Sequence, residues 1–189
     1  MMKEIRIHGR GGQGVVTAGE LLATAAFEDG LYSQALPSFG TERMGAPVEA
    51  YVRLSDSKIR RRTKVDNPDY VIVQDSTLLE SESVDVTRGL KKGALVLINT
   101  EKPINKLSRK ADALILAVPA TAIARETIGR PIPNTALVGA FAAATKEISL
   151  EAVARSIRHR FPGEAGEKNV QAATRAFELA KEAARENHP

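Results

Sequence analysis

The order of apolar and polar residues predicts alternating strands and helices in the first part of the chain. Residues 5–8 alternate between apolar and polar side chains, which is typical of a short strand. Apolar residues then recur at helical spacing over 15–29, and Gly30 follows where a C-terminal glycine cap belongs. A second short strand is predicted at 32–35. A strand, a helix and a strand in this order indicate a parallel sheet with crossover helices.

Further along, continuous apolar runs predict three more strands, at 70–74, 94–99 and 113–118. Such runs are typical of strands that are covered on both faces of a sheet. Before them, residues 48–54 and 59–62 predict two strands joined by a four-residue polar turn. We therefore expect a β-hairpin inserted into the α/β pattern.

The C-terminal part of the sequence has a helical pattern. Asn134 is expected to cap a helix over 135–145 that is apolar all round. Ser149 is expected to cap a second helix, and an amphipathic helix is predicted over 167–186.

Together these elements predict an α/β fold. It consists of an open, mostly parallel, Rossmann-like sheet with an inserted β-hairpin and a helical C-terminal region. No linker or internal repeat interrupts the pattern, so we expect one domain over residues 1–189. With 43% hydrophobic and 26% charged residues, the composition excludes a disordered or collagen-like chain.

Composition also excludes several classes of function. No apolar run approaches the ~18–20 residues of a membrane span, and the first residues lack the apolar stretch of a signal peptide, so we expect neither feature. There is no cysteine, and the three histidines lie far apart, so no metal site is predicted. A net charge of +4 with only 4% aromatic residues does not support nucleic-acid binding.

A glycine-rich segment joins the first predicted strand to the first predicted helix. Glycines there would allow a tight turn and let backbone N–H groups face a phosphate, and an arginine within the turn would add a forked cation. This predicts an anionic nucleotide-like ligand; the alternative is a tight strand-to-helix connection without a ligand. The segment matches the Gly-x-Gly-x-x-Gly fingerprint and consists of Gly9, Arg10, Gly11, Gly12, Gln13 and Gly14.

A nicotinamide cofactor is poorly supported. Dinucleotide folds place Asp or Glu about 20 residues after the glycines, at the end of the second strand. Residues 32–37 contain neither an acid nor a basic residue for NADP, and Glu28 and Asp29 precede the strand. By contrast, Asp75 follows one predicted strand and Asn99-Thr100 stand at the end of the next, where ligands bind in open α/β sheets.

Three other features each have two or more interpretations. The segment 40–47 places Glu42 beside Arg43 in a stiff, Pro- and Gly-rich loop, which fits a contact loop at a partner's active site or a solvated surface turn. The basic run at 60–64 fits a solvated edge strand better than a site for an acidic partner, and nucleic acid comes third. His8 is more simply a hydrogen-bonded residue near a sheet edge than an acid–base group. No catalytic triad or carboxylate pair stands out.

Three segments in order carry a resemblance to a known family. They are 8–14, 37–47 and 133–140, supported by Asn67-Pro68-Asp69 before an apolar strand and by Asp75 after it. This pattern resembles the gamma subunit of 2-oxoacid:ferredoxin oxidoreductases and covers essentially the whole chain. The form Gly-Thr-Glu-Arg-Met-Gly-Ala-Pro favours the pyruvate branch.

The resemblance implies a role within a larger enzyme in the cytoplasm. The complex would convert pyruvate and coenzyme A to acetyl-CoA and carbon dioxide while reducing ferredoxin. Thiamine diphosphate, Mg and 4Fe–4S clusters would lie on the alpha, beta and delta subunits, so this chain would bind no cofactor and catalyse nothing alone. The glycine-rich segment would contact coenzyme A or a subunit interface, with Asp75, Asn134 and Thr135 in support. The loop facing the partner's active site would include Phe39, Gly40, Thr41, Glu42, Arg43 and Gly45.

Two other classes of function stay open at this stage. One is a stand-alone oxidoreductase that binds NAD(P) or flavin. The other is a small nucleotide-binding regulatory module, which would respond to its ligand without partner subunits.

Overall fold

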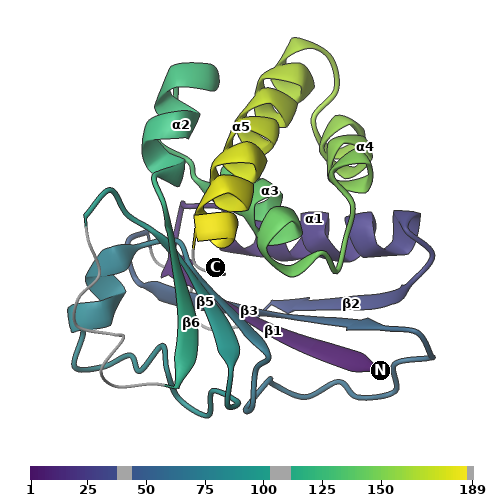
Figure 1. Cartoon of the computed structure of the whole chain (residues 1–189), viewed down its shortest axis with the longest axis vertical. Helices are drawn as coiled ribbons and strands as arrows, with labels where there is room; N and C mark the ends of the chain where they lie inside the picture. Colours follow the sequence, from purple (N-terminus) through teal and green to yellow (C-terminus); the bar gives the residue numbers. More distant parts are fainter. Residues whose placement is uncertain (38–43, 103–111, 187–189) are drawn as a thin grey trace.

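The computed structural model of the chain describes residues 1–37, 44–102 and 112–186. These residues form a six-stranded sheet in the order β2-β3-β1-β4-β5-β6 (Figure 1). β1, β4, β5 and β6 pair in parallel, whereas β3 runs antiparallel to both β1 and β2. The predicted α/β class with a mostly parallel sheet is confirmed. The strands are β1 (Met2–Arg10), β2 (Tyr32–Pro37), β3 (Pro47–Ser55), β4 (Tyr70–Val73), β5 (Ala94–Asn99) and β6 (Ala113–Val118).

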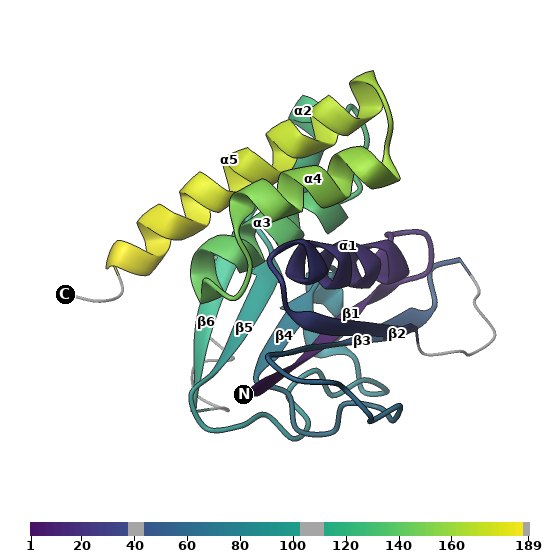
Figure 2. The ribbon, with the colours of Figure 1, turned by 90° about the vertical axis from the view of Figure 1, so that its right-hand side faces the viewer.

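The five α-helices of the described residues lie together on one face of the sheet (Figures 1 and 2). Their apolar faces and the facing strand residues form the main hydrophobic core. α3 lies in the middle of this layer and is buried from Asn134 to Ala143, as its continuous apolar sequence predicts. The helices are α1 (Val15–Glu28), α2 (Ala120–Thr127), α3 (Asn134–Thr145), α4 (Leu150–Arg160) and α5 (Glu164–Glu186).

The opposite face of the sheet is covered by irregular segments and a short 3-10 helix, η1 (Ser76–Glu80). Leu78 and Val86 from these segments pack on Val71 and Val96 of the sheet in a second, smaller core. The connection from β4 to β5 therefore contains no α-helix. The expectation of helical crossovers is correct for α1 and wrong for this connection. Residues 81–93 carry too few apolar residues at helical spacing to form an amphipathic helix.

The predicted β-hairpin is wrong. Residues 47–55 do form a strand, but 59–62 do not, and β3 is inserted between β1 and β2 instead. Both hydrogen-bonding edges of β3 are thus already occupied, so no edge is left for a hairpin partner. β2 consequently runs parallel to β1, as the strand–helix–strand pattern predicts, without being its neighbour.

The helix ends follow the sequence signals with one exception. Gly30 has a φ of 84°, and the N–H of Leu31 donates to the carbonyl oxygen of Ala26 at 2.9 Å, which closes α1 as expected of a glycine cap. The Ser149 hydroxyl accepts from the backbone N–H of Ala152, so it caps α4 as predicted. Asn134, in contrast, is the first residue of α3 rather than its cap, because the helix begins after Pro133.

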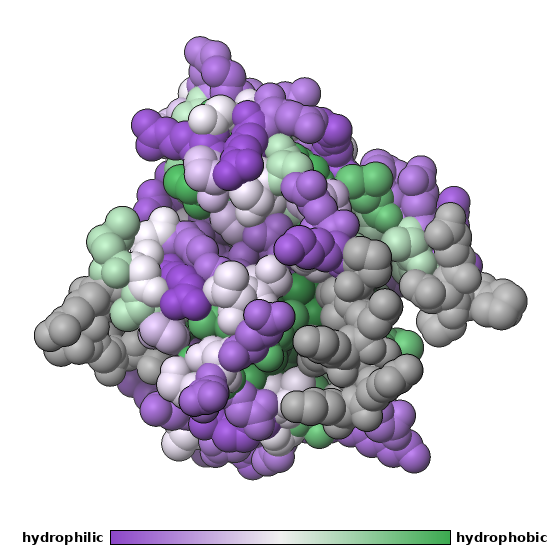
Figure 3. Space-filling view, turned by 90° about the vertical axis from the view of Figure 1, so that its left-hand side faces the viewer, coloured by the Kyte–Doolittle hydropathy of each residue, from purple (hydrophilic) through white to green (hydrophobic). Residues whose placement is uncertain are grey.

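The surface that carries η1 and the β6 edge contains both apolar and polar areas. Leu114 on β6 is 54% exposed, and Figure 3 shows apolar areas between polar ones on this side. No helix in the described part of the chain combines the length and apolarity needed to cross a membrane.

Candidate functional site

The glycine-rich segment forms the expected turn between β1 and α1. Gly12 and Gly14 have φ angles of 92° and 73°, in the left-handed region that glycine adopts without strain. A Cβ on Gly14 would also lie 2.5 Å from Nδ2 of Asn134. The first and third sequence motifs are therefore in contact, and this contact leaves no room for a side chain at position 14.

The described end of the second motif also meets this turn. The N–H of Gly11 donates to the Ala46 carbonyl oxygen at 2.9 Å, and the N–H of Gly45 donates to the Gly11 carbonyl oxygen at 3.1 Å. Met44 pairs with Gly11 in a parallel bridge. Phe39, Gly40, Thr41, Glu42 and Arg43 lie outside the described residues, so the role predicted for them stays a prediction.

Asp75 connects these segments from the end of β4. Its carboxylate accepts from Nε of Arg10 at 3.2 Å, from Nε2 of Gln13 at 2.9 Å and from the Thr77 backbone N–H at 3.0 Å. Burial alone would raise the pKa of Asp75, but the hydrogen bonds from Thr77 and Gln13 and the charge of Arg10 outweigh it and lower the pKa below its ordinary value. Asp75 is therefore a carboxylate that holds the turn in place.

Arg10 has a structural role within the isolated chain. Besides Asp75, its guanidinium donates to the Gly45 carbonyl oxygen at 3.0 Å and to the Thr77 hydroxyl at 2.9 Å. These bonds join the turn, the loop end and η1. Its side chain is 31% exposed, so part of the guanidinium still faces solvent.

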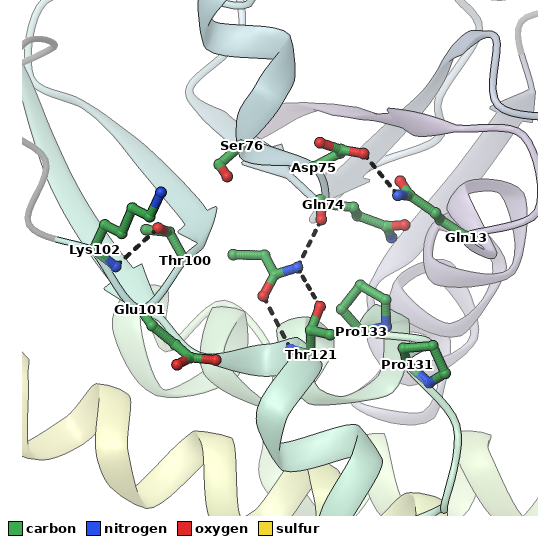
Figure 4. Close-up of a pocket in the computed structure, with 11 residues that line it drawn as sticks. Gln13, Gln74, Asp75, Ser76, Thr100, Glu101, Lys102, Thr121, Pro131 and Pro133 are labelled. Carbon is green, nitrogen blue, oxygen red and sulfur yellow. Dashed lines mark hydrogen bonds between the residues drawn. The ribbon is translucent and has the colours of Figure 1, made fainter.

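A pocket of about 450 Å³ opens beside this turn, at the carboxyl ends of β4 and β5. Such a place is where ligands bind in open α/β sheets, and the volume is typical of small-molecule sites. Figure 4 shows its polar side chains coming from the turn, from both strand ends and from the start of α2. The pocket is lined by Gln13, Gln74, Asp75, Ser76, Asn99, Thr100, Glu101, Lys102, Thr121, Pro131 and Pro133.

Gln74 is the one buried side chain in the described residues whose polar atoms have no partner. It is 1% exposed, and neither Oε1 nor Nε2 makes a hydrogen bond. In Figure 4 its side chain lies between Gln13 and Pro133. Asn99 beside it is fully engaged, because it bonds the Gln74 carbonyl oxygen and both the N–H and hydroxyl of Thr121. An unpartnered buried amide is costly unless a ligand or water satisfies it, so Gln74 is a candidate contact for a ligand in the pocket.

Asn134 and Thr135 lie behind the glycine-rich turn and do not line the pocket. The Asn134 side chain accepts from the Thr135 N–H at 2.8 Å and packs on Gly14. The Thr135 hydroxyl, fully buried, donates to Asn169 of α5 at 3.0 Å. Both residues therefore fix α3 between the turn and α5.

The sequence pattern missed a buried polar ladder on the sheet face opposite the helices. Its rungs follow the register of β1 against β3, with His8 opposite Glu49, Arg6 opposite Tyr51 and Glu4 opposite Arg53. The alternation in β1 suggests a solvated face, yet Glu4, Arg6 and His8 are at most 8% exposed. Opposite charges at matching positions of β1 and β3 are the signal that could have revealed it.

His8 is a structural member of this ladder, in an inner strand rather than near a sheet edge. Its Nε2 accepts from Nε of Arg6 at 2.9 Å, while Nδ1 lies 3.4 Å from the Glu49 carboxylate. Burial lowers the pKa of His8 to about 4, with Arg6 adding to the effect and Glu49 opposing it. The imidazole is therefore neutral at pH 7, held by two partners and away from the pocket.

No metal centre is present in the part of the chain that the structure describes. Residues 1–37, 44–102 and 112–186 contain no group of three or more His, Cys, Asp or Glu that could hold an ion. The sequence also contains no cysteine, so thiolate ligands for an iron–sulfur cluster do not exist in this chain.

Comparison with known proteins gives consistent matches over nearly the whole chain. The family model for pyruvate ferredoxin/flavodoxin oxidoreductase matches residues 4–179. Pyruvate synthase subunit PorC of Methanothermobacter marburgensis is 52% identical over 180 residues, covering 95% of this chain and 98% of that protein. The pyruvate/ketoisovalerate oxidoreductases common subunit gamma of Pyrococcus abyssi is 53% identical, covering 94% and 96%. The crystal structure of pyruvate oxidoreductase subunit PORC from Thermotoga maritima superposes with a TM-score of 0.82 at 40% identity, covering 94% and 96%.

Proposed function

Because this chain belongs to the pyruvate ferredoxin/flavodoxin oxidoreductase family, we propose that it is the gamma subunit of a cytoplasmic pyruvate:ferredoxin oxidoreductase. The complex oxidises pyruvate with coenzyme A, giving acetyl-CoA and carbon dioxide, and passes two electrons to ferredoxin. The observation that carries this proposal is the match to gamma and PorC subunits over almost the full length of both chains.

The reactive groups of the complex lie on other subunits in this proposal. Alpha, beta and delta subunits hold thiamine diphosphate, Mg and the 4Fe–4S clusters. The absence of cysteine and of a metal-binding group in the described residues supports this division. A stand-alone NAD(P) enzyme is disfavoured, because the end of β2 offers no carboxylate for a ribose.

The pocket beside the glycine-rich turn is proposed to hold part of coenzyme A. The turn leads into the N-terminus of α1, which favours a phosphate group. The Gln74 amide has an NH2 group and a carbonyl oxygen without partners, which match the amide groups of the pantetheine arm or the edge of adenine. Lys102 at the rim adds a cation for the phosphates.

The loop 38–46 is proposed to reach the thiamine-bearing subunits. Its described end, Met44–Ala46, is tied to Gly11 beside the pocket. A loop that starts from the mouth of the coenzyme A site would bring the thiol acceptor and the partner's active site together.

A shared gamma subunit is a second candidate, because the Pyrococcus abyssi relative is named as common to pyruvate and ketoisovalerate oxidoreductases. In that case the partner subunits would select the 2-oxoacid, and this chain would serve more than one complex.

Purification of the tagged chain from its native cell tests the proposal. We expect it to elute with polypeptides that contain iron, acid-labile sulfide and thiamine diphosphate. Recovery of only the free chain under non-dissociating conditions would contradict the proposal. Elution with two sets of thiamine-binding partners would favour the shared subunit.

A further inference from the structure

An exposed basic segment, residues 58–64, lies far from the pocket. Five of its seven side chains are cationic and exposed, and none makes an ion pair or hydrogen bond within the described residues. No acidic residue interrupts the run. The five are Lys58, Arg60, Arg61, Arg62 and Lys64.

Two buried arginines of the sheet hold the backbone of the segment. Arg53, 1% exposed, donates to the carbonyl oxygens of Thr63 and Lys64 at 2.8 and 3.1 Å. Arg6, 0% exposed, donates to the carbonyl oxygen of Val65 at 3.3 Å. A run of like charges outside helix and strand is thus fixed in place, although its charges repel one another.

Protection of a sheet edge does not explain these charges. Charged edge strands deter aggregation, but residues 59–62 form no strand, and the neighbours of β3 are β1 and β2. The segment lies beneath the sheet, on the face opposite the helices (Figure 2). The segment therefore lies on the side of the sheet away from the helical layer, and its cations are exposed without an ion pair in the described chain.

Taking the chain as a subunit, as proposed above, we propose that this basic segment docks an acidic surface of a partner subunit in the complex. Three of the five cations are arginines, whose forked guanidinium binds carboxylates in pairs and which are enriched in protein interfaces. Nucleic acid fits less well, because residues 56–66 contain no aromatic side chain on which a base could stack.

The surface is separate from the coenzyme A pocket. The segment follows Ser55, which pairs with Met2 at one end of β1, whereas the glycine-rich turn follows Arg10 at the other end. Loss of the docking contact should therefore weaken assembly without changing the apparent KM for coenzyme A in complexes that do form.

The test uses the assembled complex with three versions of this chain: wild type, Arg60→Glu with Arg62→Glu, and a control with Arg125→Glu and Arg185→Glu. The control arginines are exposed, make no ion pair among the described residues and lie in the helical layer, and the change in charge is the same. The measurement is the dissociation constant of the subunit from the complex, by mass photometry at about 50, 150 and 500 mM NaCl. This series spans physiological ionic strength.

We expect wild-type affinity to fall with salt, and the variant at 60 and 62 to dissociate at least about tenfold more readily at low salt with a flatter salt dependence. Arg60→Gln with Arg62→Gln should give an intermediate loss, which guards against an artefact of charge reversal. Equal affinity of all versions for the complex would overturn the inference. It would also be overturned if a labelled oligonucleotide bound tightly through Arg60 and Arg62 while the affinity of the subunit for the complex stayed unchanged. If wild type does not assemble at all, the proposed function itself has failed.

Discussion

His8 of β1 stands directly opposite Glu49 of β3, with imidazole Nδ1 3.4 Å from the Glu49 carboxylate. His8 immediately precedes the glycine-rich turn, and Glu49 follows closely on the end of the loop 38–46. The pair therefore joins the end of β1, where the glycine-rich turn begins, to the start of β3, where the loop ends. The other partner of His8 is Arg6, whose Nε donates to the second imidazole nitrogen.

Stability should fall on acidification because His8 is buried neutral. With a pKa of about 4 in the folded state and 6.5 as its ordinary value, the unfolded chain binds the proton first as pH drops. The stabilisation is present above pH 6.5 and is lost between pH 6.5 and 4, amounting to about 3 kcal/mol for this group.

The substitution His8→Gln provides the control, because a glutamine can accept from Arg6 and donate to Glu49 without titrating. The free energy of unfolding is measured with urea at about pH 7, 6, 5 and 4. It should fall less steeply with pH for His8→Gln than for wild type. Parallel pH profiles would show that His8 does not cause the dependence.

Gln74→Met should separate ligand binding from folding. The substitution removes two unsatisfied polar atoms from the core, so the isolated chain should gain about 1 kcal/mol in unfolding free energy. The assembled complex should show an apparent KM for coenzyme A raised roughly tenfold. Asn99→Leu is the matched control, because its amide is engaged and its loss should destabilise the chain. A less stable Gln74→Met chain with unchanged KM would argue for a purely structural glutamine.

Arg10→Ala tests the phosphate role of the turn. Removal of the cation leaves the Asp75 carboxylate without its arginine, beside the proposed phosphate position, so the apparent KM for coenzyme A should rise by about tenfold. Arg10→Lys retains the charge but not the forked guanidinium, so its apparent KM for coenzyme A should lie between those of wild type and Arg10→Ala. An unchanged KM in an intact complex would leave Arg10 with its bonds to Gly45 and Thr77 as its whole role.

Gly139→Ala should destabilise the chain by at least about 2 kcal/mol. A Cβ at this position would overlap with the carbonyl oxygen of Ala173 on α5, where the two helices pack backbone to backbone. Gly19→Ala in α1 is the control, since its nearest neighbour would lie at 3.4 Å, and it should be neutral or gain up to about 1 kcal/mol. Equal unfolding midpoints for both variants would show that α3 and α5 can separate at little cost.

Local signals predicted the parts of the fold that depend on neighbouring residues. The glycine-rich turn, the Gly30 and Ser149 caps and the apolar strands β4, β5 and β6 all follow from short stretches of sequence. The positions of Asp75 and Asn99 at strand ends also indicated the edge of the sheet where the pocket opens, because the carboxyl ends of parallel strands meet there.

Features set by long-range pairing were not predictable in the same way. The place of β3 between β1 and β2 depends on pairs such as Ala50 with Ile7, which are 43 residues apart in numbering. Arg6 and Arg53 look like solvated strand residues until the loop carbonyls that cover them are placed. Gln74 belongs to an apolar run, and only the packed structure shows that its amide has no partner.

Reconstitution of pyruvate oxidation tests the central claim most directly. The measurement is ferredoxin reduction that depends on pyruvate and coenzyme A, made with this chain alone, with its partner subunits alone and with all of them together. We predict no turnover by this chain alone, and full activity only when it joins its partners. Turnover by the lone chain, or full activity of the partners without it, would contradict the account.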